Sequence, residues 1–492
     1  MKRRQFVGAG LALAATWPLR GFSAVLKGVG DLSAKTLAGG DVTLPASSIE
    51  ALAASLRGDL LLANSTDYDR TRRVWNAAFD KKPALIVRCT GAADVRQAVD
   101  FAREHQLLTA VRAGGHSLSG KSSCEGGLMI DLQQMQGVRV DPETQRAYLE
   151  SGSLLGQLDH ECAAFGLATT AGTVSHTGAA GLTLGGGFGR LGRRFGLACD
   201  NVASFDIVTA DGRFLRANDH ENPDLFWGLR GGGGNFGIVT AIEYRLHPMD
   251  PVILGGSIVW PLDQARDVLR FYRDIALDAP ELVNLGPGMH WEPDGPKVTV
   301  EVCWSGARAN GEAWLKKLRA FGKPARDDIA AMPYVTLQAS GDEILGAGKY
   351  YHLKGGFLTQ LKDDGIDLII DSYKRMPNWY VLFMDHGGGA YRRVAPTATA
   401  FPNRDSRFML GTIGIWPNKA DMDANIEKMR ANWRELEPLT KGFYTNVADQ
   451  DTSMAHYREN YGSNFERLVA LKAKYDPANL FRLNANVPPK MG

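Results

Sequence analysis

Three glycine-rich segments are the part of this sequence best suited to holding a ligand. They occupy residues 111–120, 181–201 and 229–237 of a chain with 56 glycines among its 492 residues. Glycine lets backbone amides approach an anion closely, and it adopts the positive φ angles that shape an anion-binding concavity. Three such segments indicate a large anionic ligand, for which a dinucleotide held along its pyrophosphate is the leading candidate.

A Rossmann domain is one way to hold a dinucleotide, and residues 187–192 match its G-x-G-x-x-G pattern. In that fold the pattern follows a strand and opens a helix. Here the preceding residues 179–182 are interrupted by glycine and do not have a clean strand pattern. The sequence therefore disfavours a Rossmann domain.

His116 is the single residue with the sharpest chemical signal. It follows two glycines and precedes a serine, which predicts an exposed turn rather than a core position. A metal site would need partners at ligand spacing, and His160 and His176 lie far away in sequence. We predict no metal ion, and the pattern alone leaves His116 open between a structural and a ligand-binding role.

The elements around these segments alternate between strand and helix in the first half of the chain. Strand patterns occupy residues 83–88, 109–112, 128–132, 146–150, 204–209 and 238–246, and helix patterns occupy residues 92–105 and 154–165. Residues 25–63 show no clear periodicity. We therefore predict a loop-rich N-terminal extension there and a first domain over residues 64–248.

Beyond Pro248 glycine becomes less frequent and amphipathic helices alternate with strands. The helix patterns lie at residues 262–277 and 311–321, and the strand patterns at residues 297–304 and 408–415. We predict a second domain over residues 249–441. A C-terminal segment, residues 442–492, follows with a helix over residues 461–475 and an extended tail.

The first 24 residues have the features of an export signal. Residues 2–4 are basic, residues 6–17 form an uncharged apolar stretch, and residues 22–24 offer a small-residue cleavage site. The stretch is too short to span a bilayer, and its paired arginines match the twin-arginine signal of proteins exported in the folded state. We predict a signal peptide, the export machinery as a partner, a periplasmic or secreted location, and no stable membrane insertion.

Charge and cysteine usage argue against two further classes of protein, nucleic-acid binders and zinc-binding proteins. Without the first 24 residues the chain has 52 basic against 54 acidic residues. It lacks the basic excess of a dedicated nucleic-acid binder, so no nucleic-acid partner is predicted. Five cysteines with no C-x-x-C spacing give no support for a zinc site, and we expect mostly buried thiols.

Four motifs in order resemble the berberine-bridge-enzyme-like branch of the vanillyl-alcohol-oxidase flavoproteins. They are residues 112–116 with Gly120, residues 172–201, residues 224–237 and residues 475–484. The resemblance covers the chain from about residue 64 to its end. It implies an α+β fold, with a two-subdomain PCMH-type FAD-binding domain that has no Rossmann unit. It also implies an α+β substrate domain around an antiparallel sheet, and a C-terminal tail that returns to the FAD-binding domain.

The same resemblance implies that FAD is bound and that His116 is bonded to the 8α-methyl group of the flavin. The implied cofactor-binding residues are Arg112, Ala113, Gly114, Gly115, His116, Ser117, Gly120, Gly172, Thr173, Val174, Thr177, Gly178, Gly181, Leu184, Gly185, Gly186, Gly187, Gly189, Asn235, Gly237, Ile238, Val239, Asn484 and Asn486. Many relatives add a cysteinyl link at the position of Val174, where valine cannot form it. A single covalent link is therefore predicted, with Cys124 as the nearest thiol if that alignment is wrong.

The catalytic base is assigned by resemblance to a Tyr-x-Asn element, which Tyr444 and Asn446 match. A phenol with a pKa of about 10 must have this value lowered by a nearby cation or hydrogen bond before it can act as a base at neutral pH. Asp451 and Tyr461 are further candidates. The alternative is that Tyr444 lies on a sheet and faces the core.

The predicted function is an FAD-dependent oxidoreductase, an oxidase that takes hydride from an alcohol or amine carbon of a small molecule. The alcohol is a sugar or a secondary metabolite, and molecular oxygen or another acceptor reoxidises the flavin. One alternative is a dehydrogenase with a protein or quinone acceptor. Another is a non-catalytic periplasmic binding protein that keeps the fold without the flavin.

Overall fold

The computed structural model describes residues 29–449 and 452–491. The predicted export signal over residues 1–24 and the predicted catalytic residue Asp451 lie outside the described residues, and both stay predictions. No helix within the described ranges combines the length and apolar character needed to cross a membrane.

The first subdomain is built on a four-stranded sheet in the order β3-β4-β6-β5. Its strands are β3 (Asp59–Leu62), β4 (Leu85–Arg88), β5 (Thr109–Arg112) and β6 (Leu128–Asp131), and its helices are α1 (Ala46–Ser55), α2 (Tyr68–Arg72) and α3 (Ala92–Glu104). Strands β4, β5 and β6 run parallel to one another. Each is a short run of mostly apolar residues, as is typical of buried parallel strands. β5 ends at Arg112, immediately before the first glycine segment.

The prediction of a loop-rich segment over residues 25–63 is wrong for its described part. This region forms the hairpin β1 (Leu32–Lys35) and β2 (Asp41–Leu44), then α1 and β3, and β3 pairs antiparallel with β4. Leu44, Ile49 and Leu60 are buried in the core of the first subdomain. Four-residue strands and a single short helix are too brief to produce a recognisable period, and pairing with β4 stabilises them.

The second subdomain contains a five-stranded antiparallel sheet in the order β11-β10-β12-β8-β7. The strands are β7 (Val138–Asp141), β8 (Arg146–Glu150), β10 (Val202–Val208), β11 (Phe214–Ala217) and β12 (Ile238–Arg245); β9 (Leu167–Ala168) pairs with β13 (His247–Pro248). The helices are α4 (Leu155–Ala163), α5 (Ala179–Leu184), α6 (Gly192–Phe195) and α7 (Pro223–Leu229). Two of the three glycine segments lie in this subdomain.

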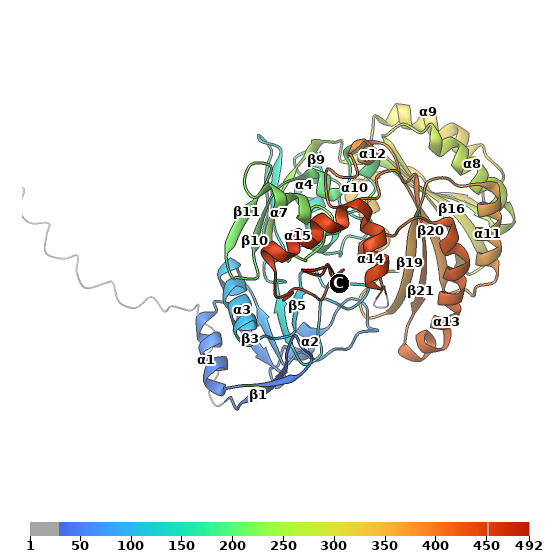
Figure 1. Cartoon of the computed structure of the whole chain (residues 1–492). Helices are drawn as coiled ribbons and strands as arrows, with labels where there is room; N and C mark the ends of the chain where they lie inside the picture. The colour runs from blue at the N-terminus through green and yellow to red at the C-terminus, as the bar shows by residue number, and fades with distance from the viewer. Residues whose placement is uncertain (1–28, 450–451, 492) are drawn as a thin grey trace, which may run out of the picture.

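The third unit is a large antiparallel sheet in the order β17-β14-β16-β15-β20-β21-β19, with β18 also paired to β14. Its strands are β14 (Val252–Pro261), β15 (Val283–Glu292), β16 (Gly295–Trp304), β17 (Arg326–Asp327), β18 (Ala330–Pro333), β19 (Tyr350–Leu358), β20 (Tyr380–His386) and β21 (Phe408–Trp416). One face is covered by α8 (Ala265–Leu277), α9 (Arg308–Arg319), α11 (Asp363–Lys374) and α13 (Lys419–Leu436), as Figure 1 shows. The opposite face contacts the first subdomain through Trp75 and Leu118.

These three units confirm the predicted α+β class and the antiparallel sheet of the second domain. The domain boundaries chosen from composition stay predictions. All five cysteines are described, and each is a free, buried thiol, as expected.

The C-terminal segment crosses back to the second subdomain. It contains α14 (Met454–Tyr461) and α15 (Phe465–Tyr475), and α15 packs beside α7 (Figure 1). Lys472 forms an ion pair of 2.7 Å with Asp476, and both side chains are fully buried. The Lys472 ammonium also donates to the carbonyl oxygens of Asn235 (2.8 Å) and Phe481 (3.0 Å). This buried ion pair and its hydrogen bonds join the third glycine segment to the C-terminal tail.

Removal of the buried cation should destabilise the fold strongly. We expect Lys472→Met to lower the free energy of unfolding by about 3–5 kcal/mol, because Asp476 would keep a buried charge without its cation. The matched control is Lys474→Met, which removes an exposed ion pair with Asp224 and should cost less than about 1 kcal/mol. Chemical unfolding monitored by fluorescence measures the free energy of unfolding of both variants. Equal losses in the two would contradict this role of the buried ion pair.

Candidate active site

The loop that carries His116 is held against residues 174–178, just before the second glycine segment, by a contact between two glycines. A Cβ atom on Gly114 would lie 2.3 Å from the Cα atom of Gly178, and a Cβ on Gly178 would lie 2.7 Å from the Cα atom of Gly114. Real Cβ atoms do not approach other atoms this closely. The two backbones therefore touch only because both residues lack side chains, and the contact brings residues 113–117 beside residues 174–178.

The His116 ring is part of an aromatic stack. It lies on Trp75, with ring centroids 4.2 Å apart, and Trp75 lies on Tyr351 of β19 at 3.8 Å. Burial lowers the pKa of His116 to about 3, and the charge of His176 adds to this shift. The predicted exposed turn is wrong in this respect, because side chains from distant segments cover the ring. At neutral pH the imidazole is uncharged, so a ring nitrogen keeps its lone pair.

Unpaired hydrogen-bonding groups around His116 fit a bound dinucleotide. Within the described chain, none of the six amides from Gly114 to Ser119 donates a hydrogen bond to another protein group. Amides in such partly buried loops are nearly always paired, so a run of six indicates a ligand rich in acceptor oxygens. The His116 Nε2 atom and the side-chain oxygens of Asn484 and Asn486 are also buried without a partner.

The glycines of the second segment serve mainly to let chain segments pack closely. A Cβ on Gly185 would lie 2.0 Å from Asn446 Oδ1, and one on Gly189 would lie 1.9 Å from the Ala171 carbonyl oxygen. Gly186 packs against Phe401 in the same way. Of the other predicted residues, Gly172, Thr173 and Thr177 lie just before this segment, and Leu184 and Gly187 lie within it. Gly181 is the exception, because a Cβ there would meet nothing within 4 Å.

The third glycine segment is tied to the C-terminal tail. Asn235 accepts a hydrogen bond from the Val487 amide (2.9 Å) and donates one to the Ala485 carbonyl (3.0 Å). Asn484 donates to the Gly234 carbonyl (3.2 Å), and its own carbonyl accepts from Lys121 (3.0 Å). The tail thus lies beside the His116 loop. Two other predicted cofactor residues, Ile238 and Val239, are buried in β12 and belong to the protein core.

Tyr444 and Asn446 contact the second glycine segment, and their predicted catalytic role stays a prediction. The phenol oxygen of Tyr444 accepts hydrogen bonds from the Gly187 amide (3.1 Å) and from Asn446 Nδ2 (2.7 Å). Burial nevertheless raises the pKa of Tyr444 above its ordinary value, and these hydrogen bonds offset only part of the rise. The structure therefore leaves Tyr444 as a neutral phenol. Tyr461 lies elsewhere and donates to the Gly231 carbonyl (3.3 Å).

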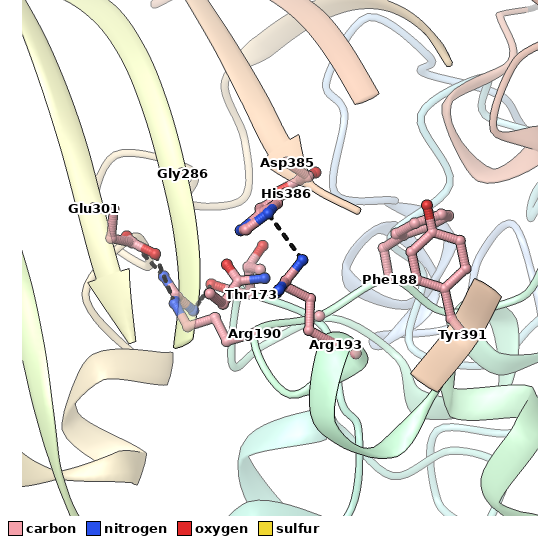
Figure 2. Close-up of a pocket in the computed structure, with 12 residues that line it drawn as sticks. Thr173, Phe188, Arg190, Arg193, Gly286, Glu301, Asp385, His386 and Tyr391 are labelled. Atoms are coloured by element: carbon pink, nitrogen blue, oxygen red, sulfur yellow. Dashed lines mark hydrogen bonds and ion pairs between the residues drawn. The ribbon is translucent and has the colours of Figure 1, made fainter. Parts of the chain in front are cut away.

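A pocket lies between the second glycine segment and the large sheet (Figure 2). Arg190 crosses it and pairs with Glu301 through two contacts of 2.8 and 3.0 Å, while its third nitrogen donates to the Thr173 carbonyl (2.9 Å). Asp385 and Phe188 also line the pocket. The Phe188 ring lies 5.1 Å from that of Tyr444, which places the tyrosine directly behind the pocket wall.

Asp385 is the titratable residue in this pocket that sequence reasoning missed. Burial raises the pKa of Asp385 to about 6; the charge of Glu301 adds to the rise and that of Arg190 opposes it. Its carboxylate accepts no hydrogen bond from any described residue. Strand register places Asp385 beside Gly286, and Gly286 pairs with Glu301, so the pocket opens over a residue without a side chain. The available signal was a carboxylate on the same face of β20 as Val381 and Phe383, the half-exposed face that alternates with the core-facing residues.

The sheet face beyond Asp385 is apolar. Residues paired across neighbouring strands point to the same side, and one such row contains Leu353, Ile413 and Val381. These side chains pack with Trp75, Tyr351, Phe383, Ile415 and Val447 in one partly exposed cluster. A ligand over His116 would meet this surface.

The fold combines two α+β subdomains with a covering sheet, and its site holds a neutral histidine among unpaired amides. Together these features define a flavin-dependent enzyme of the PCMH type. The family model for FAD-binding domains matches residues 83–218, and the model for berberine and berberine-like proteins matches residues 443–488. The chain belongs to the berberine-bridge-enzyme-like FAD-linked oxidoreductases. It binds FAD, as predicted.

Individual relatives support this assignment along almost the whole chain. An FAD-linked oxidoreductase from Dictyostelium discoideum is 33% identical, with 88% of this chain and 95% of that protein covered. The crystal structure of 6-hydroxy-D-nicotine oxidase from Arthrobacter nicotinovorans superposes with a TM-score of 0.82 at 28% identity, covering 89% and 99% of the two chains. That of carbohydrate oxidase from Microdochium nivale gives 0.81 at 26% identity, covering 90% and 100%.

Proposed function

We propose that this enzyme oxidises an alcohol or amine with an apolar skeleton, and that Asp385 is the base. The observation that carries the proposal is the apolar sheet face, which is interrupted by one carboxylate without a hydrogen-bond partner. When bound, FAD supplies the hydride acceptor. Membership of this enzyme family argues against the alternative of a non-catalytic binding protein.

The apolar face favours such a substrate over a sugar. A hydroxyl group that becomes buried without a hydrogen-bond partner costs about 1–3 kcal/mol, and a sugar would present several to Leu353, Val381 and Ile413. An aromatic or aliphatic skeleton has no such cost. Its alcohol or amine group would lie further along β20, four residues beyond Val381, where Asp385 is.

The charged groups around Asp385 suit proton transfer near neutral pH. Arg190 binds Glu301 through a two-point ion pair, and the negative charge of Glu301 raises the pKa of Asp385. The resulting pKa of about 6 lets the carboxylate exist at neutral pH and still accept a proton readily. Burial raises the pKa of Tyr444, so this phenol keeps its proton at neutral pH.

Replacement of Asp385 tests its role. We expect Asp385→Asn to lower kcat/KM by about 100-fold or more, because an amide cannot accept the proton. In the wild type, activity should rise with pH through an apparent pKa of about 6, since only the ionised carboxylate acts as a base. This rise should vanish in Asp385→Asn and persist in the control Asp405→Asn, an exposed acid of the same domain. An unchanged profile in Asp385→Asn would refute the assignment.

The substrate class and the acceptor can be measured on one protein. Under anaerobic conditions, apolar aromatic or aliphatic alcohols and amines should bleach the flavin faster than oligosaccharides do. Faster bleaching by oligosaccharides would overturn the proposed class. Stopped-flow mixing of the reduced enzyme with air-saturated buffer should reoxidise it within seconds, as an oxidase requires. Reoxidation over many minutes would instead favour the dehydrogenase alternative.

We also infer a single covalent link between His116 and the flavin 8α carbon. The neutral imidazole, whose Nε2 atom has no partner among the described residues, and the valine at position 174 support it. Acid-precipitated wild-type protein should stay yellow, with the flavin mass on the tryptic fragment 113–121. His116→Ala should release all colour on precipitation, whereas the control His160→Ala, an exposed histidine, should retain it. Colour retained by His116→Ala would refute the link.

A further inference from the structure

A second histidine stands beside His116 with no assigned role. The ring of His176 lies 5.1 Å from that of His116, at an angle of 34°. The Nε2 atoms of both rings are buried and have no hydrogen-bond partner in the described chain. Two adjacent imidazoles with unsatisfied nitrogens need an explanation, because buried polar atoms are normally paired.

The position of His176 is fixed from both sides. The neighbouring Thr177 carbonyl accepts a hydrogen bond from the Leu155 amide (2.9 Å), and Gly178 touches Gly114. On the other side, the Ser175 amide donates to Asp342 Oδ1 (3.0 Å), and the Ser175 hydroxyl donates to the other oxygen of that carboxylate. The His176 ring therefore has a set distance to the His116 ring.

We propose that His176 accepts the proton that His116 loses when the flavin becomes attached, so that the two histidines let the chain attach its own cofactor. This inference rests on the proposed link at His116. Trp75 stacks on the His116 ring, and the His176 imidazole is a second neighbouring ring, with centroids 5.1 Å apart. Asp342 is bound to Ser175 and Glu301 to Arg190, so neither carboxylate is free to take this proton.

The attachment balances in atoms and electrons. One nitrogen of His116 forms a bond to the 8α carbon, and one C–H bond at that carbon and the N–H bond of His116 break. The electron pair from this carbon reduces the isoalloxazine ring, which takes up one of the two released protons. His176 takes the other. Molecular oxygen, as the external oxidant, then removes the electron pair and restores the oxidised flavin.

The rate of attachment tests this role without reference to substrate turnover. Wild-type protein and variants, produced under riboflavin limitation, are mixed with FAD in air, and acid-stable flavin fluorescence is followed with time. We expect His176→Ala and His176→Gln to bind FAD but to attach it about 100-fold more slowly, the usual loss when a general base is removed. Added imidazole should restore much of the rate to His176→Ala. His160→Ala should behave as the wild type.

Other outcomes would overturn the proposal. Attachment at the wild-type rate in His176→Gln would show that no proton acceptor is needed there. Failure of both variants to bind FAD, or a slow rate that imidazole does not restore, would assign His176 to structure rather than to proton transfer. An unmodified fragment 113–121 in the wild type would refute the link at His116 itself, and with it the inference. This measurement separates failure of the link from failure of the role of His176 alone.

Discussion

The backbone contact between Gly114 and Gly178 is the constraint on which the site depends. Any side chain at either position would separate the two loops, because a Cβ would lie within 2.7 Å of the facing Cα. The contact brings His116 beside His176 and leaves the amides after Gly114 without protein partners. One steric requirement thus places the attachment residue, its neighbouring base and the donors for a dinucleotide in a single loop pair.

The large antiparallel sheet supplies the other half of the site through its register. Pairing across β15, β16 and β20 sets Asp385 and Glu301 on either side of Gly286, and Arg190 of the second glycine segment binds Glu301. The pKa of Asp385 is therefore set at the interface between the domains. A carboxylate at this interface loses water and feels a fixed neighbouring charge, which is how its proton affinity comes to lie near neutral pH.

Much of the fold could be predicted because its longer elements have strong periodicity. The helix patterns at residues 92–105 and 262–277 correspond closely to α3 and α8, and most predicted strands were found within two or three residues. The N-terminal region was missed because its strands have four residues each and are stabilised by pairing with β4. Asp385 was missed for a similar reason, since a single carboxylate in β20 forms no motif and gains meaning only from its neighbours.

The sequence by itself determined the glycine segments and the order of the motifs, because these depend on residue type and short spacing. The family resemblance of those motifs implied FAD, the role of His116 and the Tyr-x-Asn element. Only the tertiary structure decided which atoms meet. It covered a histidine ring that was expected on an exposed turn, raised the pKa of a tyrosine that was expected to act as the base, and placed His176 beside His116, 60 positions away along the chain. The physical reason is that burial, proton affinity and contact are properties of surroundings assembled from distant segments, which local sequence does not specify.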